Sequence, residues 1–529
     1  MTDEHRDDIP APDAPDREHL PALKDERPDV RAMHFPRSGA HRQPGVRWAA
    51  AAIAFTAAIL ILLQNINIFP TPQIEETEPE SLIVSPQLTD PVLISSKLML
   101  GAFELPFLDA DTKETINKLV FAEESQQDLS AIDLLRMAIL RGVAVDPASG
   151  IEMLSRAEER IERRTQEVAN DATLSEADRE TYAKLFDEVS SDIAFVRTVL
   201  TESLDAVDAY DLDQFTTRHG WFGRLLKTYG TEKGRQQRKL MAAQGARAFL
   251  ILFVMITVVV CAFVVGCILA FVAWFANFQG HLHWRMRHPK GPIYLYAETF
   301  ALFLGSFLAL IVVTELAMLG ASEKTAGVIG VLRMLAQAGL ALLCFYPFFR
   351  TKRPDLISRD IGWHTGKGLT SEIFAGIIGY FAGLPIIALG VAVMALLVSV
   401  VSAFSDGSGG SGPTHPIVES YTRSSIEIFI AYFFAVIWAP FVEETMFRGY
   451  FFTYLRNRHG FILSGLLTAF VFAAIHPQGW MFIPALGSIG YVMAMLREWR
   501  GSLIAPMVAH AMHNATLVTF GVLLFKTLM

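Results

Sequence analysis

Long apolar runs dominate the second half of the chain, and polar segments separate them. From residue 248 onward we count eight runs that could span a bilayer, which a helix of about 20 residues crosses. A ninth run lies near the N-terminus. The pattern predicts an all-α fold, a polytopic transmembrane bundle of about eight core helices with an N-terminal anchor helix and an inserted α-helical soluble domain. The predicted core spans are residues 248–275, 297–319, 325–349, 372–403, 424–446, 460–476, 480–496 and 503–525.

The polar segments divide the chain into four parts. Residues 1–47 are rich in Pro, Asp, Arg and His, which predicts a disordered cytoplasmic tail. Residues 48–69 are predicted to be a transmembrane anchor. A cleaved signal peptide is disfavoured by the long preceding tail and by the lack of a small-x-small cleavage pattern. Residues 71–246 are predicted to form an α-helical extracytoplasmic domain, and residues 248–529 a multi-span membrane domain.

Two stretches of the 71–246 segment have helical periodicity, Leu129–Leu140 and Tyr182–Leu200. In the second stretch, Tyr182 shares one face with aliphatic residues that follow at helical spacing. Ser175 with Asp178 is typical of a helix start. No motif in this segment carries recognisable chemistry.

Basic residues predict the topology. When the predicted spans are taken in order, four short basic loops fall on the same side of the membrane as the N-terminus. The positive-inside rule makes that side the cytoplasm. The Gly/Ser-rich segment Ser405–Pro413 falls on the other side and is predicted to be a flexible linker. The stretch Arg218–Arg247 disagrees with this rule, because it is basic although the order of the spans places it outside the cytoplasm. The loops contain Arg285, Arg287 and Lys290; Arg350, Lys352, Arg353 and Arg359; Arg456 and Arg458; and Arg497 and Arg500.

Composition agrees with a membrane protein. Of the 529 residues, 52% are hydrophobic and only 19% are charged. The net charge of -9 argues against nucleic acid as a partner. Cys261, Cys267 and Cys344 lie in apolar runs without disulfide or metal spacing, and we expect all three to be buried in the core.

Ionisable residues occur in the apolar run that ends in WAPFVEETMFRGY. Such residues are expensive in hydrocarbon and usually face a cavity and a partner. Glu443 and Glu444 are adjacent and can border one cavity, and Arg448 lies within salt-bridge reach of Glu444. We therefore expect Arg448 to hold Glu444 charged and leave Glu443 free as a base. The alternative is an ordinary helix end with surface ion pairs.

The two following motifs carry histidines. His476 closes an apolar run before Pro477, either as a base or metal ligand or as a capping residue. His510 and Asn514 share a face of the last span, where they can donate to an oxyanion or join helices. His513 lies off that face and can pair with His510 on a metal. HExxH, GxSxG and Walker-type signatures are missing.

The three motifs EETMFR, FAAIH and HAMHN resemble the EExxxR, FxxxH and HxxxN motifs of the CPBP family of intramembrane endopeptidases. The resemblance covers residues 297–524 and implies that residues 248–529 form an intramembrane peptidase domain. It implies that Glu443 and His476 activate a water, that His510 and Asn514 stabilise the oxyanion, and that Glu444 with Arg448 supports Glu443.

The resemblance leaves metal dependence open. One mechanism uses Zn²⁺ held by His476, His510 and Glu443, and the other is a glutamate-type mechanism without a metal. It also implies a membrane-associated peptide or protein substrate in contact with the lipid bilayer, and a multi-pass protein of a bacterial inner membrane. The anchor and residues 71–246 are not explained by it, and the latter are expected to select substrates or bind a protein partner. Nothing in the chain indicates a prenylated substrate.

Two other functions stay open. A non-catalytic membrane scaffold or bacteriocin-immunity-like protein can use the same fold. A secondary transporter with a Glu/His proton relay ranks last, because the two halves of the chain show no repeated pattern.

Overall fold

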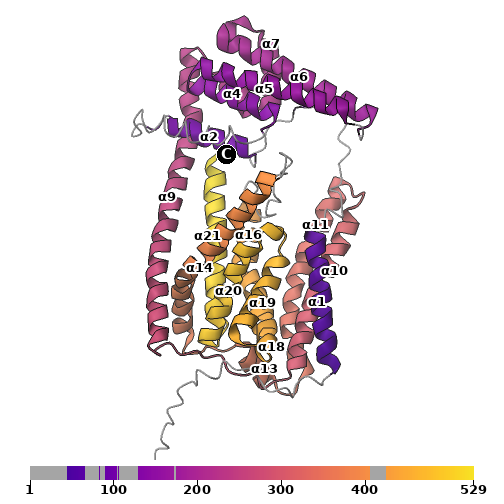
Figure 1. Cartoon of the computed structure of the whole chain (residues 1–529), viewed down its shortest axis with the longest axis vertical. Helices are drawn as coiled ribbons and strands as arrows, with labels where there is room; N and C mark the ends of the chain where they lie inside the picture. The colour runs from indigo at the N-terminus through magenta and orange to yellow at the C-terminus, as the bar shows by residue number, and fades with distance from the viewer. Residues whose placement is uncertain are drawn as a thin grey trace, which may run out of the picture.

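The computed structural model describes residues 44–65, 90–103, 129–171, 174–404 and 425–528, together with Ile83 and Leu105. Every regular element in these residues is helical (Figure 1). Residues 1–43 of the predicted tail and the predicted linker Ser405–Pro413 lie outside the described residues, whereas residues 44–47 of that tail belong to the first helix, which begins at Pro44. The helices are α1 (Pro44–Asn65), α2 (Pro91–Phe103), α4 (Ala131–Ala144), α5 (Pro147–Asn170), α6 (Glu176–Thr201), α7 (Ala209–His219), α8 (Trp221–Leu226), α9 (Glu232–Phe278), α10 (Ile293–Met318), α11 (Glu323–Gly339), α12 (Tyr346–Arg350), α13 (Pro354–Ile361), α14 (Leu369–Phe404), α16 (Ser425–Tyr432), α17 (Ala439–Glu443), α18 (Phe452–Arg456), α19 (Phe461–Ala474), α20 (Ile483–Arg500) and α21 (Ile504–Leu528).

Seven helical segments in the described residues are long and apolar enough to cross a membrane. They correspond to seven of the eight predicted core spans, which confirms the all-α polytopic bundle. α19 is shorter, with 14 residues, and begins at Phe461, where the remaining span, residues 460–476, was predicted. Figure 1 shows these helices side by side, with α1 against α10 at one edge and α9 at the other. The seven segments are Glu232–Phe278, Ile293–Met318, Lys324–Arg350, Leu369–Val401, Ser425–Arg456, Trp480–Arg500 and Ile504–Leu528.

α9 differs most from its prediction. It is one helix of 47 residues, so the predicted span 248–275 is only its apolar part and the predicted boundary near residue 247 lies inside it. The basic residues before Ala248 favour helix as well as the apolar ones do, and Gly245 near this boundary packs against α2 instead of ending the helix. One rigid element therefore joins the membrane bundle to the polar helices.

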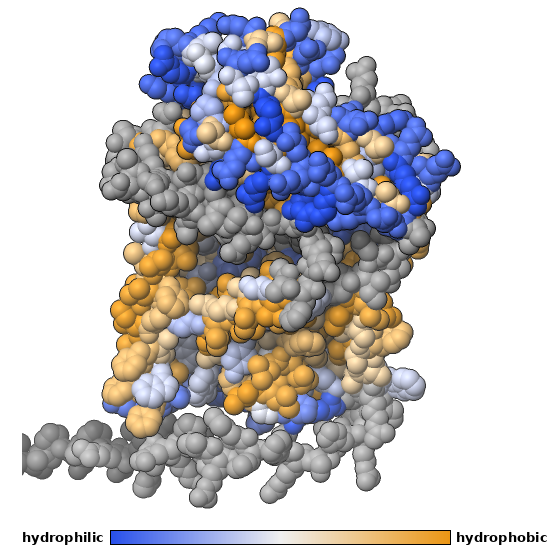
Figure 2. Space-filling model, turned by 45° about the horizontal axis from the view of Figure 1, so that its top comes forward, coloured by the Kyte–Doolittle hydropathy of each residue, from blue (hydrophilic) through white to orange (hydrophobic). Residues whose placement is uncertain are grey.

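Helices α4 to α8, together with α2, pack around an apolar core that includes Leu135, Leu154, Ile193 and Phe222. The predicted helix start at Ser175 is confirmed, because its side chain and that of Asp178 form a reciprocal capping box. This assembly lies at one end of the bundle, and its surface is hydrophilic above an apolar band (Figure 2). The domain limits 71 and 246 stay a prediction.

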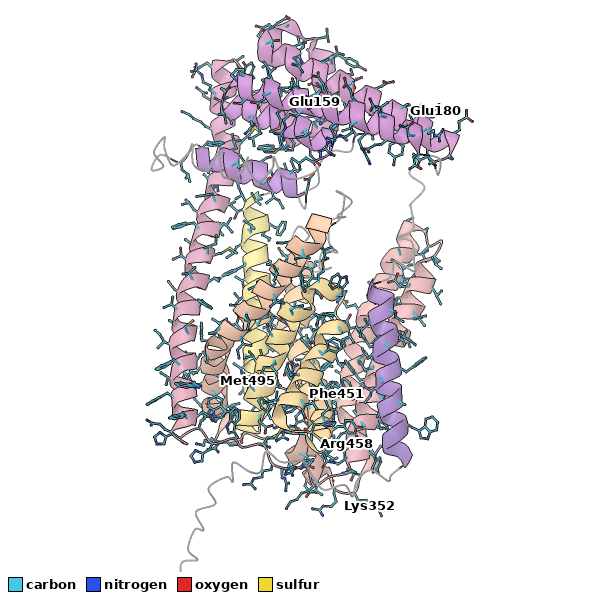
Figure 3. All side chains as sticks on the ribbon, viewed as in Figure 1. Glu159, Glu180, Lys352, Phe451, Arg458 and Met495 are labelled. Carbon is cyan, nitrogen blue, oxygen red and sulfur yellow. The ribbon has the colours of Figure 1, made fainter. Side chains whose placement is uncertain are left out.

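The short basic loops lie at the opposite end of the bundle. Figure 3 shows Lys352 and Arg458 at that end, Phe451 inside the bundle, and Glu159 and Glu180 on the polar helices. The two ends are therefore chemically distinct, as the charge pattern predicts.

The prediction for the cysteines is wrong at two positions. Cys344 is buried, but Cys261 and Cys267 are exposed on α9. α9 lies at the edge of the bundle and is apolar all round, so the sequence pattern does not separate its lipid-facing side from its packed side.

Candidate active site

The carboxylates lie on the membrane helix that runs from Ser425 to Arg456. This helix is irregular, because Phe433–Trp438 and Glu444–Phe451 form π-helical turns on either side of the short α17. π-helical turns are rare and often mark functional sites. Here the second one begins at Glu444 and includes Arg448.

Glu444 and Arg448 form an ion pair that is shielded from solvent. The Arg448 Nη1 donates to Glu444 Oε1 at 2.9 Å, and both side chains have no exposed surface. Arg448 Nη2 donates to the carbonyl of Gly490 on α20 at 2.9 Å, and its guanidinium lies 4.6 Å from the Phe472 ring centroid. The pair therefore ties three helices together and holds Glu444 in one orientation, as the sequence predicts.

His510 extends this pair to the last helix. Its Nδ1 lies 2.8 Å from Glu444 Oε1, so the neutral ring carries its hydrogen on Nδ1 and donates it to the carboxylate. Its Nε2 then points toward Glu443, with 3.9 Å between Nε2 and Oε2. That distance exceeds a direct hydrogen bond, so the two atoms can share a water molecule only if it lies beside them.

Glu443 has a different environment from Glu444. Its side chain is 21% exposed, whereas that of Glu444 is fully buried. The sequence predicts a supporting role for Glu444 and the role of a free base for Glu443, and both roles stay predictions.

His476 follows the end of α19. A helix of 14 residues is about 21 Å long, shorter than the ~30 Å hydrocarbon core, so its C-terminal end lies at membrane depth. Non-helical backbone at this depth needs protein or a water-lined cavity around it. His476 Nδ1 lies 2.5 Å from the carbonyl of Phe472, which leaves Nε2 as the acceptor nitrogen.

The Phe472 ring links the two histidines. Its centroid lies 4.5 Å from that of His476 and 6.1 Å from that of His510. Within the described residues, no hydrogen bond joins His476 to Glu443. His476 is thus linked to the carboxylate cluster through the Phe472 ring, without a direct hydrogen bond to Glu443.

Asn514 lies on α21, one turn after His510. Its Nδ2 donates to the carbonyl of Ala435, in the first π-helical turn, at 2.7 Å. An amide has two N–H donors, so one remains for another acceptor. His513 turns away and lies 3.2 Å from the hydroxyl of Tyr380 on α14, so it does not pair with His510 on a common ligand here.

Comparison with known proteins gives a consistent result. Over 141 residues the chain is 28% identical to the membrane-embedded CAAX protease MroQ of Staphylococcus aureus (strain USA300), an alignment covering 26% of this chain and 57% of the relative. Residues 425–516 match the family model of Rce1-like type II CAAX prenyl endopeptidases. This part of the chain is a CPBP-family domain.

The chain is accordingly an integral, multi-pass membrane protein. It spans little more than half the length of the curated relative it matches. No solved structure matches the chain. All six candidate residues of the CPBP domain, from Glu443 to Asn514, lie within the matched segment.

The CPBP domain contains a supporting residue that sequence reasoning missed. Arg497 was assigned to a cytoplasmic loop, but its side chain is buried near the end of α20. It donates to the carbonyls of Arg448, Asp360 and Gly501. Arg497 thereby holds the π-helical turn against two neighbouring segments. Only its position in an apolar helix could have indicated this.

A metal ion is one option for a CPBP domain, so we tested its fit. His476, His510 and Glu443 are the predicted zinc ligands, but in the described residues no group of three His, Cys, Asp or Glu side chains is arranged to hold a metal ion. The Nδ1 atoms of His476 and His510 are hydrogen-bonded to Phe472 and Glu444, so each ring has only its Nε2 left for a metal ion. Metal dependence therefore stays a prediction, and the reaction steps proposed for this site use no metal ion.

Proposed function

We propose that the protein is an intramembrane endopeptidase that hydrolyses a peptide bond in a membrane-associated substrate. The observation that carries this proposal is the buried Glu444–Arg448–His510 cluster beside the accessible Glu443. A cluster of charges in an apolar bundle is expensive and marks a functional site by default. The match to Rce1-like endopeptidases supports the reaction class.

Each residue of the cluster has a proposed task. Glu443 accepts a proton from a water molecule bound alongside Glu443 Oε2 and His510 Nε2, assisted by the free Nε2 of His476. The hydroxide oxygen attacks the scissile carbonyl carbon. Arg448 and His510 keep Glu444 fixed, so the carboxylate of Glu443 meets the water in one orientation.

The negative charge that develops on the carbonyl oxygen needs hydrogen-bond donors. The second N–H of Asn514 is one proposed donor. His510 is proposed to be the other in its imidazolium form, which carries a hydrogen on Nε2 as well as on the Nδ1 that faces Glu444. When the tetrahedral intermediate collapses, the C–N bond breaks and the proton held by Glu443 moves to the leaving nitrogen. The products are a carboxylic acid and an amine, and one water is consumed.

The site is proposed to lie inside the membrane, nearer the end of the bundle that carries the basic loops. Glu443 precedes Arg456, at the end of its helical segment, by roughly 20 Å at 1.5 Å per residue. His510 follows the start of α21 at Ile504 by about 9 Å. A substrate therefore has to enter the bundle, which favours peptides that already partition into the membrane.

The charge pattern supports an orientation. The end of the bundle with Lys352 and Arg458 is proposed to face the cytoplasm, with the N-terminus on the same side. The polar helices α4 to α8 then lie outside, where they are proposed to select substrates or bind a partner. A bacterial cytoplasmic membrane is the proposed location.

The experiment compares purified wild type with Glu443→Ala in detergent, each incubated with a membrane proteome. Mass spectrometry of new peptide termini reads the result. Termini that appear with wild type and not with the variant are expected, and a repeat with chelator tests the metal. Identical termini from both folded proteins would favour the non-catalytic scaffold.

A further inference from the structure

A cavity lies far from the carboxylate cluster, where the C-terminal end of α21 meets α9. Figure 1 shows this end of α21 beside α9 and just below α2. The cavity has a volume of about 460 Å³, which is in the range of ligand sites. Its described lining consists of Gln244, Arg247, Leu250, Ile251, Lys526 and Thr527.

The lining separates into a polar part and an apolar part. Arg247 and Lys526 carry positive charge from two different helices, and no acidic side chain occurs in the described lining. Arg247 Nε donates to Ala243 of its own helix at 3.2 Å, so the guanidinium keeps further donors for a ligand. Leu250 and Ile251 supply an aliphatic wall beside the cations.

The cavity lies at the depth of lipid headgroups. Arg247 directly precedes the apolar part of α9, and Lys526 lies near the end of the apolar α21. Below the cavity, Val254 and Val258 continue an exposed apolar face toward the membrane centre, with 57% and 52% of their surface accessible. A ligand with an anionic head and apolar chains matches this gradient.

Lys97 strengthens the positive end. It donates from α2 to the carbonyl of Leu528 at 2.5 Å. Unpaired carbonyls at a helix C-terminus carry partial negative charge, which would repel an anion. The contact offsets that charge where the anion would bind.

We propose that this cavity binds the phosphodiester headgroup of an anionic phospholipid. Arg247 and Lys526 contact the phosphate oxygens, and the acyl chains lie along Leu250 and Val254. The proposal also accounts for the basic residues that precede Ala248, which the positive-inside rule does not explain on this side of the membrane. It does not depend on peptidase activity.

The test measures lipid retained by the full-length protein in detergent, by native mass spectrometry. Phosphatidylglycerol, phosphatidylcholine and inorganic phosphate are titrated separately. Wild type is expected to retain phosphatidylglycerol over phosphatidylcholine. The variant R247Q/K526Q is expected to bind phosphatidylglycerol about thirtyfold more weakly, from about 1 kcal/mol per cation near a lipid surface.

Two control variants separate this site from general charge effects. K233Q/K239Q removes two cations from exposed positions of the same helix and is expected to bind like wild type. R247K/K526R keeps both charges and is expected to retain the lipid. Equal retention by wild type and R247Q/K526Q, or no preference for phosphatidylglycerol, would overturn the proposal. Displacement of the lipid by inorganic phosphate would assign the site to a free anion instead.

Discussion

At the scale of single residues, the contrast between Glu443 and Glu444 is the main finding. Adjacent residues of one type have different environments because Arg448 and His510 both contact Glu444, whereas Glu443 remains accessible. The i, i+4 spacing was enough to predict the Glu444–Arg448 pair. Its partners Gly490 and Phe472 come from other helices, and one sequence without an alignment gives no distance between helices.

The buried pair makes a prediction about stability. Arg448→Met removes the cation beside the buried Glu444 and leaves its carboxylate with His510 alone, which is expected to destabilise the fold by about 3–5 kcal/mol. Apparent melting temperature in detergent measures the effect. The double variant Glu444→Gln/Arg448→Met should recover most of the loss, and Arg350→Met, at an exposed position, should change little. An unchanged melting temperature for Arg448→Met would contradict the account.

His219 makes a prediction about pH. It is fully buried on α7, and its Nε2 lies 2.8 Å from Asp192, which also pairs with Arg218. Burial lowers the pKa of His219 from its ordinary value of 6.5, despite the raising effect of Asp192. The unfolded state then binds the proton more readily, so the stability of α4 to α8 should fall as the pH drops below 6.5.

Hydrogen exchange of α6 and α7 at pH 7.5 and pH 5.5 checks this expectation. His219→Gln should lose less protection on acidification than wild type, and each pH is compared across variants so that intrinsic rates cancel. The exposed His288→Gln serves as the control. Equal losses in wild type and His219→Gln would remove His219 as the cause.

At the scale of elements, the helix ends that local residues determine were predictable from the sequence. Ser175 indicated the start of α6, and Pro477 indicated that α19 ends before it. The π-helical turns were not predictable, because they depend on tertiary contacts such as that from Arg497 to the Arg448 carbonyl. The wrong assignment of Cys261 and Cys267 has a similar origin, since lipid and protein interior select the same apolar residues.

The close contact between α2 and α9 makes a prediction about helix packing. A Cβ on Gly245 would lie 1.8 Å from the carbonyl oxygen of Lys97, and one on Gly101 would lie 2.0 Å from backbone of α9. Gly245→Ala is therefore expected to push the two helices apart and cost about 1–3 kcal/mol. Faster hydrogen exchange in α2 measures it. Gly330→Ala, where a Cβ meets nothing within 4 Å, is the matched control.

At the scale of the whole molecule, a polar helical assembly and a charged loop surface lie at opposite ends of the bundle (Figure 3). The fold class and most spans were predictable, because hydrocarbon thickness fixes their length. The role of α4 to α8 was not predictable from the sequence, because the residues of their core serve packing alone.

The orientation of these two ends can be measured directly. In a background without native cysteines, Glu180→Cys is expected to react with a membrane-impermeant maleimide in intact spheroplasts. Lys352→Cys is expected to react only after permeabilisation, because the basic loops are proposed to face the cytoplasm. The reverse pattern would invert the proposed topology.

The most direct test of the central claim is the rate at which Glu443→Gln cleaves a substrate identified from the wild-type termini. Loss of the general base is expected to lower the rate by roughly 10²–10⁴-fold, with the protein still folded. Glu427→Gln, near the start of the same membrane helix, should cleave at the wild-type rate. If Glu443→Gln cleaves as fast as Glu427→Gln, Glu443 is not the base and the proposed mechanism is wrong.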